Sequence, residues 1–389
     1  MIDLQFEPRA CECCGRDDLE PVWSNQRVVR KSVGTYLFRV HVAVCRTCGF
    51  CFASPGPSRE HLRRYYADGL SSCEAIAPSY SIERRMTVLE RYRAPSGVFL
   101  EVGGDRPEAF HQQCTGLFGT VLNVEVSDDA ASDFKSIEDV PAGSVDVLAH
   151  YDVLEHVPEV AEFLGACHRA LKKDGVLVCE VPDLRLYPRN LLLLEFEHVN
   201  HFSTATLGAL GEASGFRLVE VGHACSRPFG FLAVFRKQRP QPGRRIELPF
   251  EHLDALACVR GGVAQIERAL GRVRDVRERI KDLEARGRRV TLWGVTDLLR
   301  RLLDDWTLPK MAVVVDVDPR RRTHLEAQGV EVFQPHEQRD HVRESDLLVI
   351  CAPRYRDQIV ELAARQSGRR FSGSVLEVLG AGEAGESLL

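Results

Sequence analysis

The chain has 389 residues, a length that favours two or three domains over a single one. Hydrophobic residues make up 44% and charged residues 28% of the sequence, as in ordinary folded proteins. The net charge of −5, from 51 basic and 56 acidic residues, gives no positive excess for binding nucleic acid or an anionic membrane. We therefore expect neither of these partners.

Two features bear on the compartment. The first ten residues, MIDLQFEPRA, carry charges where a secretory signal peptide needs an apolar core. The apolar runs, such as Leu191–Leu194, are far shorter than the ~20 residues that cross a bilayer. In such a chain, thirteen cysteines indicate reduced thiols or metal ligands rather than disulfides. We expect a cytoplasmic protein.

Residues 1–75 predict a zinc-binding module. Two Cys-x-x-Cys-Gly segments, Cys11–Gly15 and Cys45–Gly49, place four thiols in pairs that can reach one tetrahedral ion. The predicted ligands of this structural Zn²⁺ are Cys11, Cys14, Cys45 and Cys48. Between the pairs, Val28–Val44 is rich in β-branched residues and predicts the strands of a zinc ribbon. Cys13 and Cys51 are further thiols that could compete for the metal, and buried cysteines without a metal are the alternative.

Residues 76–238 alternate between apolar runs and helical patterns, which predicts βαβ units around a parallel sheet. The expected strands are Gly97–Val102, Thr120–Val126, Val145–Ala149, Gly175–Val181, Phe216–Gly222 and Phe231–Arg236. The expected helices are Pro107–Leu117, Pro158–Leu171 and Ser203–Ser214. Ser203 is the predicted N-cap of the last helix, and Gly215 its C-terminal stop.

Residues 239–287 predict a linker followed by a long helix. Apolar residues recur every three or four positions from Val259 to Leu283, and Gly287 follows them. We expect the apolar face to pack against its own chain rather than form a dimer seam. Monomer and homodimer both remain open.

Residues 288–389 predict a second Rossmann-like α/β domain. Its expected strands are Val290–Trp293, Met311–Val317 and Asp346–Cys351, with a helix from Asp297. The first turn holds a single glycine, Gly294, and Asp316 follows the second strand. Without the full glycine set, a scaffolding or substrate-orienting role is favoured over a second cofactor site.

A glycine turn follows the first strand of the central domain. The sequence Glu101-Val-Gly103-Gly104 lets the backbone approach a nucleotide-type ligand. Glu125 follows the next strand, about 20 residues later, where an acidic side chain accepts hydrogen bonds from ribose hydroxyls. The alternative is a chance glycine turn with an unrelated surface glutamate.

The segment Asp152-Val-Leu-Glu-His-Val-Pro158, with the later Arg169–Gly175, resembles the corresponding motifs of class I S-adenosylmethionine (SAM) dependent methyltransferases. Glu197-His198-Val-Asn-His201-Phe-Ser203 matches a segment before their last helix and strand. The order of the three parts is similar to that of the sugar C-methyltransferases. These join a zinc-binding segment, a SAM domain and a Rossmann-like domain, and they act on nucleotide-linked keto-sugars.

The resemblance implies SAM as cofactor, a small-molecule acceptor that is a nucleotide-linked sugar, and C-methylation in glycan or natural-product biosynthesis. The implied SAM contacts are Glu101, Gly103, Gly104 and Asp105 at the turn, Glu125 at the ribose, Asp133 near adenine, and His150, Tyr151 and Asp152 beside the methyl group. His198 matches the family's histidine for proton removal, and Glu197 and His201 are expected to support it.

The chain departs from this pattern in three places. Pro107 stands where the last glycine of the turn belongs, the interval from Val126 to Val145 is too short for a helix and a third strand, and Glu195 replaces a tyrosine. Two alternatives therefore stay open. One is an O- or N-methyltransferase, and the other is a non-catalytic scaffold with a degraded SAM site.

Overall fold

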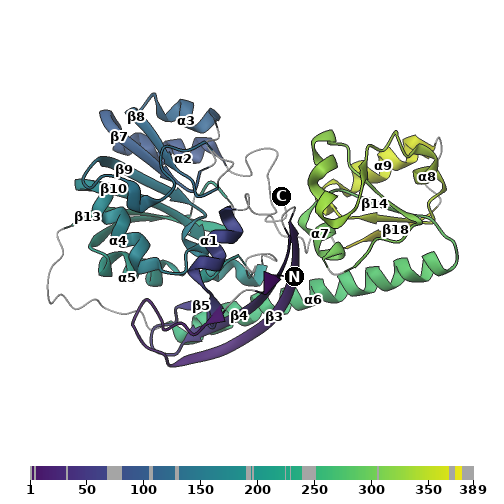
Figure 1. The fold of residues 1–389 in the computed structure, drawn as a ribbon, viewed down its shortest axis with the longest axis horizontal. Coiled ribbons are helices and arrows are strands. Elements are labelled where there is room, and N and C mark those ends of the chain that lie inside the picture. Colours follow the sequence, from purple (N-terminus) through teal and green to yellow (C-terminus); the bar gives the residue numbers. More distant parts are fainter. Residues whose placement is uncertain are drawn as a thin grey trace.

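The computed structural model describes residues 2–3, 6–31, 34–67, 81–104, 108–127, 131–189, 194, 197–223, 225–227, 229–238, 251–304, 306–367 and 373–378. Figure 1 shows a sheet-containing unit at each end, joined along one side by a long helix. Within the described residues, no helix has the length and apolar character that crossing a membrane requires.

The N-terminal part is built on a long β-hairpin. Its strands β3 (Leu19–Lys31) and β4 (Gly34–Cys45) pair antiparallel along almost their whole length. The same sheet adds β1 (Ile2–Asp3) and β5 (Cys51–Ala53), while β2 (Phe6–Glu7) pairs with β6 (Gly56–Pro57). Helix α1 (Arg59–Ala67) follows. The expected ribbon strands are thus confirmed, but the hairpin extends well beyond the range that β-branched residues predicted.

The central domain is a six-stranded sheet in the order β12-β13-β10-β9-β7-β8. Its strands are β7 (Ala94–Val102), β8 (Phe118–Val124), β9 (Val145–Tyr151), β10 (Leu171–Pro182), β12 (Phe216–Gly222) and β13 (Gly230–Lys237). Strands β8, β7, β9 and β10 are parallel, and β13 is antiparallel to both of its neighbours. All six expected strands are present.

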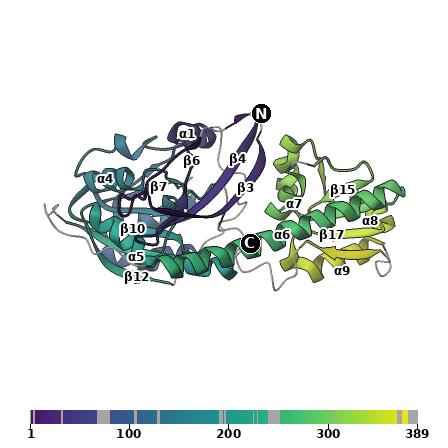
Figure 2. The ribbon, with the colours of Figure 1, turned by 90° about the horizontal axis from the view of Figure 1, so that it is seen from below.

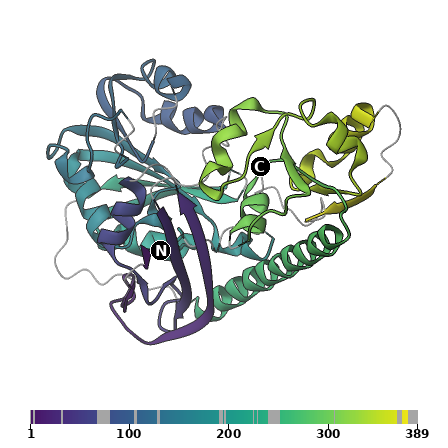
Figure 3. The ribbon, with the colours of Figure 1, turned by 45° about the vertical axis from the view of Figure 1, so that its right-hand side comes forward.

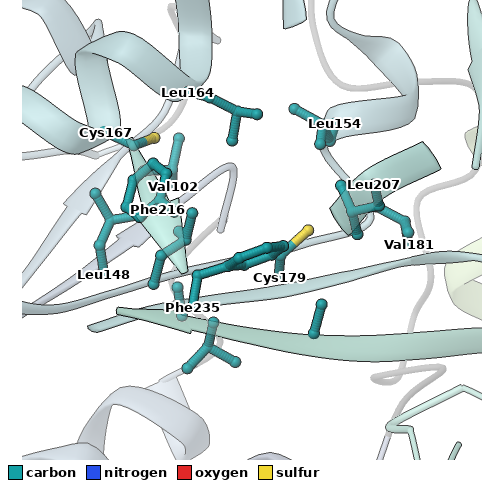
Figure 4. Close-up of a cluster of buried hydrophobic side chains, with 14 of the residues drawn as sticks. Val102, Leu148, Leu154, Leu164, Cys167, Cys179, Val181, Leu207, Phe216 and Phe235 are labelled. Carbon is teal, nitrogen blue, oxygen red and sulfur yellow. The ribbon is translucent and has the colours of Figure 1, made fainter. Parts of the chain in front are cut away.

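Helices cover both faces of this sheet. They are α2 (Ile82–Leu89), α3 (Glu108–Cys114), α4 (Val160–Ala170) and α5 (Thr204–Ala213), with short 3-10 turns at Glu90–Tyr92, Ile137–Asp139, Leu154–His156 and Leu184–Arg189. Ser203 caps α5 as predicted, because its side chain accepts from the Thr206 N–H. Figure 4 shows the core beneath α4 and α5, where Cys167, Phe216 and Phe235 pack with Leu148 and Cys179.

The interval between β8 and β9 contains no further strand among its described residues. Only an isolated bridge, Val124 to Phe134, and the turn Ile137–Asp139 occur there. Strand β8 therefore forms the edge of the sheet. The expectation that this side is shortened is confirmed.

Helix α6 (His252–Ala285) connects the two ends of the molecule. Figures 1 and 2 show it running beneath the central domain and on to the C-terminal domain. Its first half packs Leu256, Val259 and Ile266 into one core with Tyr36 and Tyr187. Its second half, from Val273 to Leu283, belongs to the core of the C-terminal domain. The expected packing against its own chain is confirmed.

The C-terminal domain has five parallel strands in the order β16-β15-β14-β17-β18. These are β14 (Val290–Trp293), β15 (Ala312–Val315), β16 (Val332–Phe333), β17 (Leu347–Ile350) and β18 (Ser374–Glu377). The helices are α7 (Asp297–Leu303), α8 (Arg339–Glu344) and α9 (Arg356–Ser367), with 3-10 segments at Pro319–Gln328 and Pro353–Tyr355.

The three parts are less separate than the sequence suggested. Strand β11 (Asn200–His201), from the central domain, pairs with β5 and completes the N-terminal sheet. The hairpin also reaches the C-terminal domain, where Arg27 Nε lies 2.9 Å from Asp304 Oδ2. Figure 3 shows the hairpin ending beside that domain. Pairing between distant segments leaves no local trace in the sequence, so the boundary near residue 75 does not mark an independent unit.

Candidate functional site

The four predicted zinc ligands converge. The sulfurs of Cys11, Cys14, Cys45 and Cys48 all lie within 4.8 Å of one another. Two of the pairs, Cys11–Cys48 and Cys14–Cys45, have Sγ–Sγ distances of 3.5 Å. Four sulfurs bound to one zinc at about 2.3 Å lie about 3.8 Å apart, so the group has the size of a tetrahedral site.

Backbone turns hold these thiols in place. Gly15 N–H donates to the Cys11 carbonyl and Gly49 N–H to the Cys45 carbonyl. Gly15 has a φ of 74° and Gly49 a φ of 81°, a region in which only glycine is unstrained. The thiols also influence one another, because contact with the Cys11 and Cys13 thiols lowers the pKa of Cys48. Such a set favours binding of a thiophilic ion.

The predicted cofactor residues occur at one edge of the central sheet. Strand pairing places Val102 beside Val124 and His150, and Tyr151 beside Glu180, so the carboxyl ends of β7, β8, β9 and β10 lie together. Gly103 follows β7 with a φ of 76° and is exposed. A Cβ on Gly103 would lie 2.4 Å from Val153 Cγ2, and the turn therefore has room for hydrogen only.

Glu101 lies beneath this turn. Its side chain is buried, with Oε2 2.6 Å from His111 Nε2 and Oε1 3.5 Å from Arg85 Nη1. A Cβ on Gly104 would lie 2.3 Å from Oε2 of the same carboxylate. The Arg85 guanidinium also lies 3.8 Å from the centre of the Tyr151 ring. Arg85 and His111 thus complete a buried network that no sequence motif indicated.

Glu125 and Asp133 belong to the loop after β8. Glu125 is buried, and its Oε1 accepts from the Ser127 N–H at 3.0 Å. The Asp133 carboxylate accepts from the Asn123 N–H at 2.9 Å and so closes the loop onto the strand. Asp105 lies outside the described residues.

At the end of β9, the side chains of Tyr151 and Asp152 lie in different surroundings from that of His150. Asp152 has a φ of 54°, and its Oδ2 lies 2.9 Å from Arg227 Nε. His150 is fully buried on the opposite face, with its ring against Phe163 of α4 and no hydrogen-bond partner on either nitrogen among the described residues. Burial lowers its pKa to about 3. The resemblance implied that His150 lies at the mouth of the pocket. Because side chains alternate along a strand, His150 lies in the core instead.

A second group of polar side chains surrounds the turn after β9. The rings of His156 and His198 contact edge to face with centroids 4.9 Å apart, and Glu155 Oε1 lies 3.9 Å from His156 Nε2. His156 Nδ1 lies 2.9 Å from the Glu197 carbonyl oxygen and 3.0 Å from the Tyr66 hydroxyl.

Residues of the N-terminal part contribute to this group. The Tyr65 hydroxyl donates to Glu197 Oε1 at 2.7 Å, and Tyr66 lies against His156. The group thus contains Glu197 and His198, which are neighbours in the chain, together with Glu155, His156 and the two tyrosines. Glu155 and His156 stood in a quoted motif, but their proximity to His198 depends on the fold.

His201 does not join this group. It is fully buried on β11, and its Nδ1 lies 2.8 Å from the Tyr187 hydroxyl. Burial lowers its pKa to about 3. The nearby His198 contributes a smaller part of the same shift.

In the C-terminal domain, both carboxylate oxygens of Asp316 accept hydrogen bonds from backbone N–H groups of nearby loops. Its Oδ2 accepts from the Val295 N–H at 2.7 Å and its Oδ1 from the Asp318 N–H at 2.9 Å. Gly294 has a φ of 102°, and a Cβ there would lie 2.7 Å from Ala352 Cβ. These local contacts explain why an aspartate and a glycine occur at positions 316 and 294.

Comparison with known proteins gives the central part a family likeness. Residues 59–221 match the model of a methyltransferase domain. A Mycolicibacterium smegmatis protein named as a probable S-adenosylmethionine-dependent methyltransferase is 31% identical over 80 residues, which are 20% of this chain and 31% of that protein. The chain thus spans about a third of the length of this curated relative.

Solved structures similar to the chain include SAM-dependent methyltransferases. One from Mesorhizobium loti is 15% identical, with a TM-score of 0.34, over 40% of this chain and all of that one. Another, from Aquifex aeolicus, is 16% identical, with a TM-score of 0.33, over 41% of this chain and 93% of that one. The central part thus has a Rossmann-like α/β sheet with a glycine turn, and residues 59–221 are similar to a methyltransferase domain.

Proposed function

We propose that this chain is a SAM-dependent methyltransferase that binds its cofactor over Gly103 and Gly104 and its acceptor beside His198. The observation that carries the proposal is the glycine turn at the carboxyl ends of four parallel strands, inside the region that matches a methyltransferase domain. Ligands of open α/β sheets bind at this edge.

The residues at this edge fit the cofactor. The backbone of Gly103 is exposed and carries no side chain, so the cofactor could approach it closely. Glu125 would accept hydrogen bonds from the ribose hydroxyls, and Tyr151 and Asp152 would form the wall near the methyl group. When bound, SAM supplies a methyl group on a sulfonium, which needs no further activation by the protein.

The proposed acceptor is a nucleotide-linked keto-sugar, methylated on carbon. This finer proposal rests on the order of the three parts and on the Glu197-His198 segment, which resemble the sugar C-methyltransferases. His198 would take the proton from the carbon next to the ketone, since imidazole titrates close to neutral pH. Glu197, held by Tyr65, would orient the acceptor.

O-methylation is a second candidate. The observation that favours it is the pairing of His156 with His198 beside the Glu155 carboxylate, since such a group can also deprotonate a hydroxyl. In both cases, we propose that Cys11, Cys14, Cys45 and Cys48 hold a structural Zn²⁺, supported by the spacing of their sulfurs.

Calorimetry of the unmutated protein with SAM, and with its demethylated product, tests the proposal. Binding below about 1 mM, equivalent to about 4 kcal/mol, is the expected result. If neither compound binds at that level, the chain is a scaffold with a methyltransferase fold. Product analysis for a carbon-bound or oxygen-bound methyl group then separates the two candidates.

A further inference from the structure

The side chains of Glu155, His156 and His198 form a second compact group of potential metal ligands. One ligand atom from each lies within 4.8 Å of the others. Unlike the cysteine cluster, this group contains only nitrogen and oxygen donors. It occurs at the turn after β9, at the sheet edge where the acceptor would bind.

Glu155 is the first observation that points to a cation. Its side chain is 1% exposed, and neither carboxylate oxygen has a hydrogen-bond partner among the described residues. His156 Nε2 lies 3.9 Å from Glu155 Oε1. A carboxylate buried in this way is unfavourable unless a positive charge compensates it. Arg227 contributes some positive charge to Glu155, but its Nε lies 2.9 Å from Asp152 Oδ2 and makes no hydrogen bond to Glu155.

The contacts of His156 are the second observation. Its Nδ1 lies 2.9 Å from the Glu197 carbonyl oxygen, which can only accept a hydrogen bond, so Nδ1 carries the proton. The lone pair is then on Nε2, the nitrogen nearest to Glu155. Metal-ligating histidines almost always donate their other N–H to a carbonyl or carboxylate in this manner.

The two chain segments that carry the group are held together by the backbone. The Val199 N–H donates to the Glu155 carbonyl at 2.7 Å, and Asn200 Nδ2 donates to the carbonyls of Leu154 and Val157. These bonds fix His198 relative to the turn. The ligands are thus positioned before any ion binds.

We propose that Glu155, His156 and His198 bind a divalent ion of the first transition row, such as Mn²⁺ or Zn²⁺, next to the acceptor. Two imidazoles and one carboxylate are the ligands of open sites for these metals, whereas Mg²⁺ and Ca²⁺ prefer oxygen alone. His156 and His198 are only partly buried, so coordination positions can face the acceptor.

The ion would also restrict which acceptors can bind, and this inference rests on the proposed function. A sugar with a ketone beside a hydroxyl, or with two neighbouring hydroxyls, could complete the coordination with both oxygens. The ion would lower the pKa of a bound hydroxyl, or of the C–H next to a bound ketone, so that solvent water could take the proton. His198 would then be a ligand and not the base, because a metal-bound nitrogen has no lone pair for a proton.

The test is Mn²⁺ binding by the full-length protein without SAM, prepared with a single zinc per chain so that zinc fills the cysteine cluster alone. The paramagnetic resonance signal of free Mn²⁺ reports the binding. Mn²⁺ prefers oxygen and nitrogen donors and does not displace zinc from thiolates. We expect about one ion per chain. His198→Ala and Glu155→Gln should each weaken binding at least about 10-fold, and Tyr66→Phe, which keeps all three ligands, by less. His223→Ala, an exposed histidine, is the matched control.

Circular dichroism of each variant establishes that it is folded. No Mn²⁺ binding by the unmutated protein, or binding that is equal in the folded His198→Ala and Glu155→Gln variants, would overturn the metal site. Calorimetry with SAM is independent of this measurement. Failure of the metal site with intact SAM binding leaves His198 as the base, whereas failure of SAM binding removes the enzyme itself.

Discussion

At the scale of single residues, Glu125 is the most direct test of the cofactor site. It follows β8, one strand from the glycine turn, where a carboxylate accepts from ribose hydroxyls. Such a bond to a charged acceptor contributes roughly 1.5–3 kcal/mol, so Glu125→Ala should weaken SAM binding about 10- to 150-fold by calorimetry.

Glu162→Ala is the matched control, because Glu162 is exposed on α4 and its carboxylate pairs with the exposed Arg59. Glu125→Gln preserves an acceptor for the Ser127 N–H and separates loop damage from lost cofactor contact. An unchanged dissociation constant in Glu125→Ala would show that the ribose is held elsewhere.

His150 gives a prediction about pH. Burial lowers its pKa to about 3 in the folded protein, against about 6.5 when unfolded. The unfolded chain therefore binds more protons between these values, and the stability that neutral His150 contributes is complete above pH 6.5 and is lost as the pH falls toward 3. The effect approaches about 1.4 kcal/mol per pH unit.

The variant that isolates this effect is His150→Leu. It should reduce the slope of the unfolding free energy against pH between about 6 and 4, measured by urea denaturation at a series of pH values. His223→Ala, whose side chain is 58% exposed, should leave the slope unchanged. Equal slopes for His150→Leu and the unmutated protein would mean that His150 does not titrate as the fold indicates.

At the scale of elements, the two Cys-x-x-Cys-Gly turns look equivalent in sequence but differ in packing. Both glycines have positive φ values, 74° at Gly15 and 81° at Gly49. A Cβ on Gly15 would meet nothing within 4 Å, whereas one on Gly49 would lie 2.6 Å from the Glu251 carbonyl carbon, just before α6. Only the second turn is pressed against another element.

Alanine substitution should separate these contributions. Gly15→Ala carries the conformational cost alone, about 1–2 kcal/mol of unfolding free energy. Gly49→Ala adds a backbone clash and should be clearly more destabilising in thermal or urea unfolding, because the start of α6 must move. Equal effects of the two substitutions would show that α6 does not press on the turn.

The same contrast explains how much of the protein its sequence predicts. The Ser203 cap, strand Val290–Trp293 and the paired cysteines are signalled by residues close together in the chain, and each was predicted correctly as an element or a cluster. The pairing of β11 with β5 and the approach of Glu155 to His198 join segments far apart. Periodicity and spacing carry no information about such contacts.

Site residues follow this division too. Gly103 was identified from its turn, but the burial of Glu101 against Arg85 and His111 depends on how α2 and α3 cover the sheet. The placement of His150 in the core likewise depends on the direction of alternation along β9.

At the scale of the whole molecule, strand pairing and side-chain contacts connect the cysteine cluster, the central sheet and the C-terminal domain. Strand β4 ends at Cys45 and pairs with β5, which in turn pairs with β11 of the central domain. The hairpin also contacts α6 and the C-terminal domain through Trp23–Glu267 and Arg27–Asp304. A substitution that destabilises the two Cys-x-x-Cys-Gly turns should therefore also disturb the proposed acceptor site.

Removal of two zinc ligands tests this linkage. Cys45→Ser/Cys48→Ser should abolish the one tightly bound zinc per chain expected by elemental analysis, since binding energy at such a site is largely folding energy. Because β11 begins two residues after His198, the loss should also lower the melting temperature of the central domain and weaken SAM binding. Cys258→Ser, on α6 and outside the cluster, is the control and should retain zinc. Unchanged metal content in the double variant would remove the zinc assignment, whereas zinc loss with unaltered melting and SAM binding would mean that the N-terminal part folds independently of the rest.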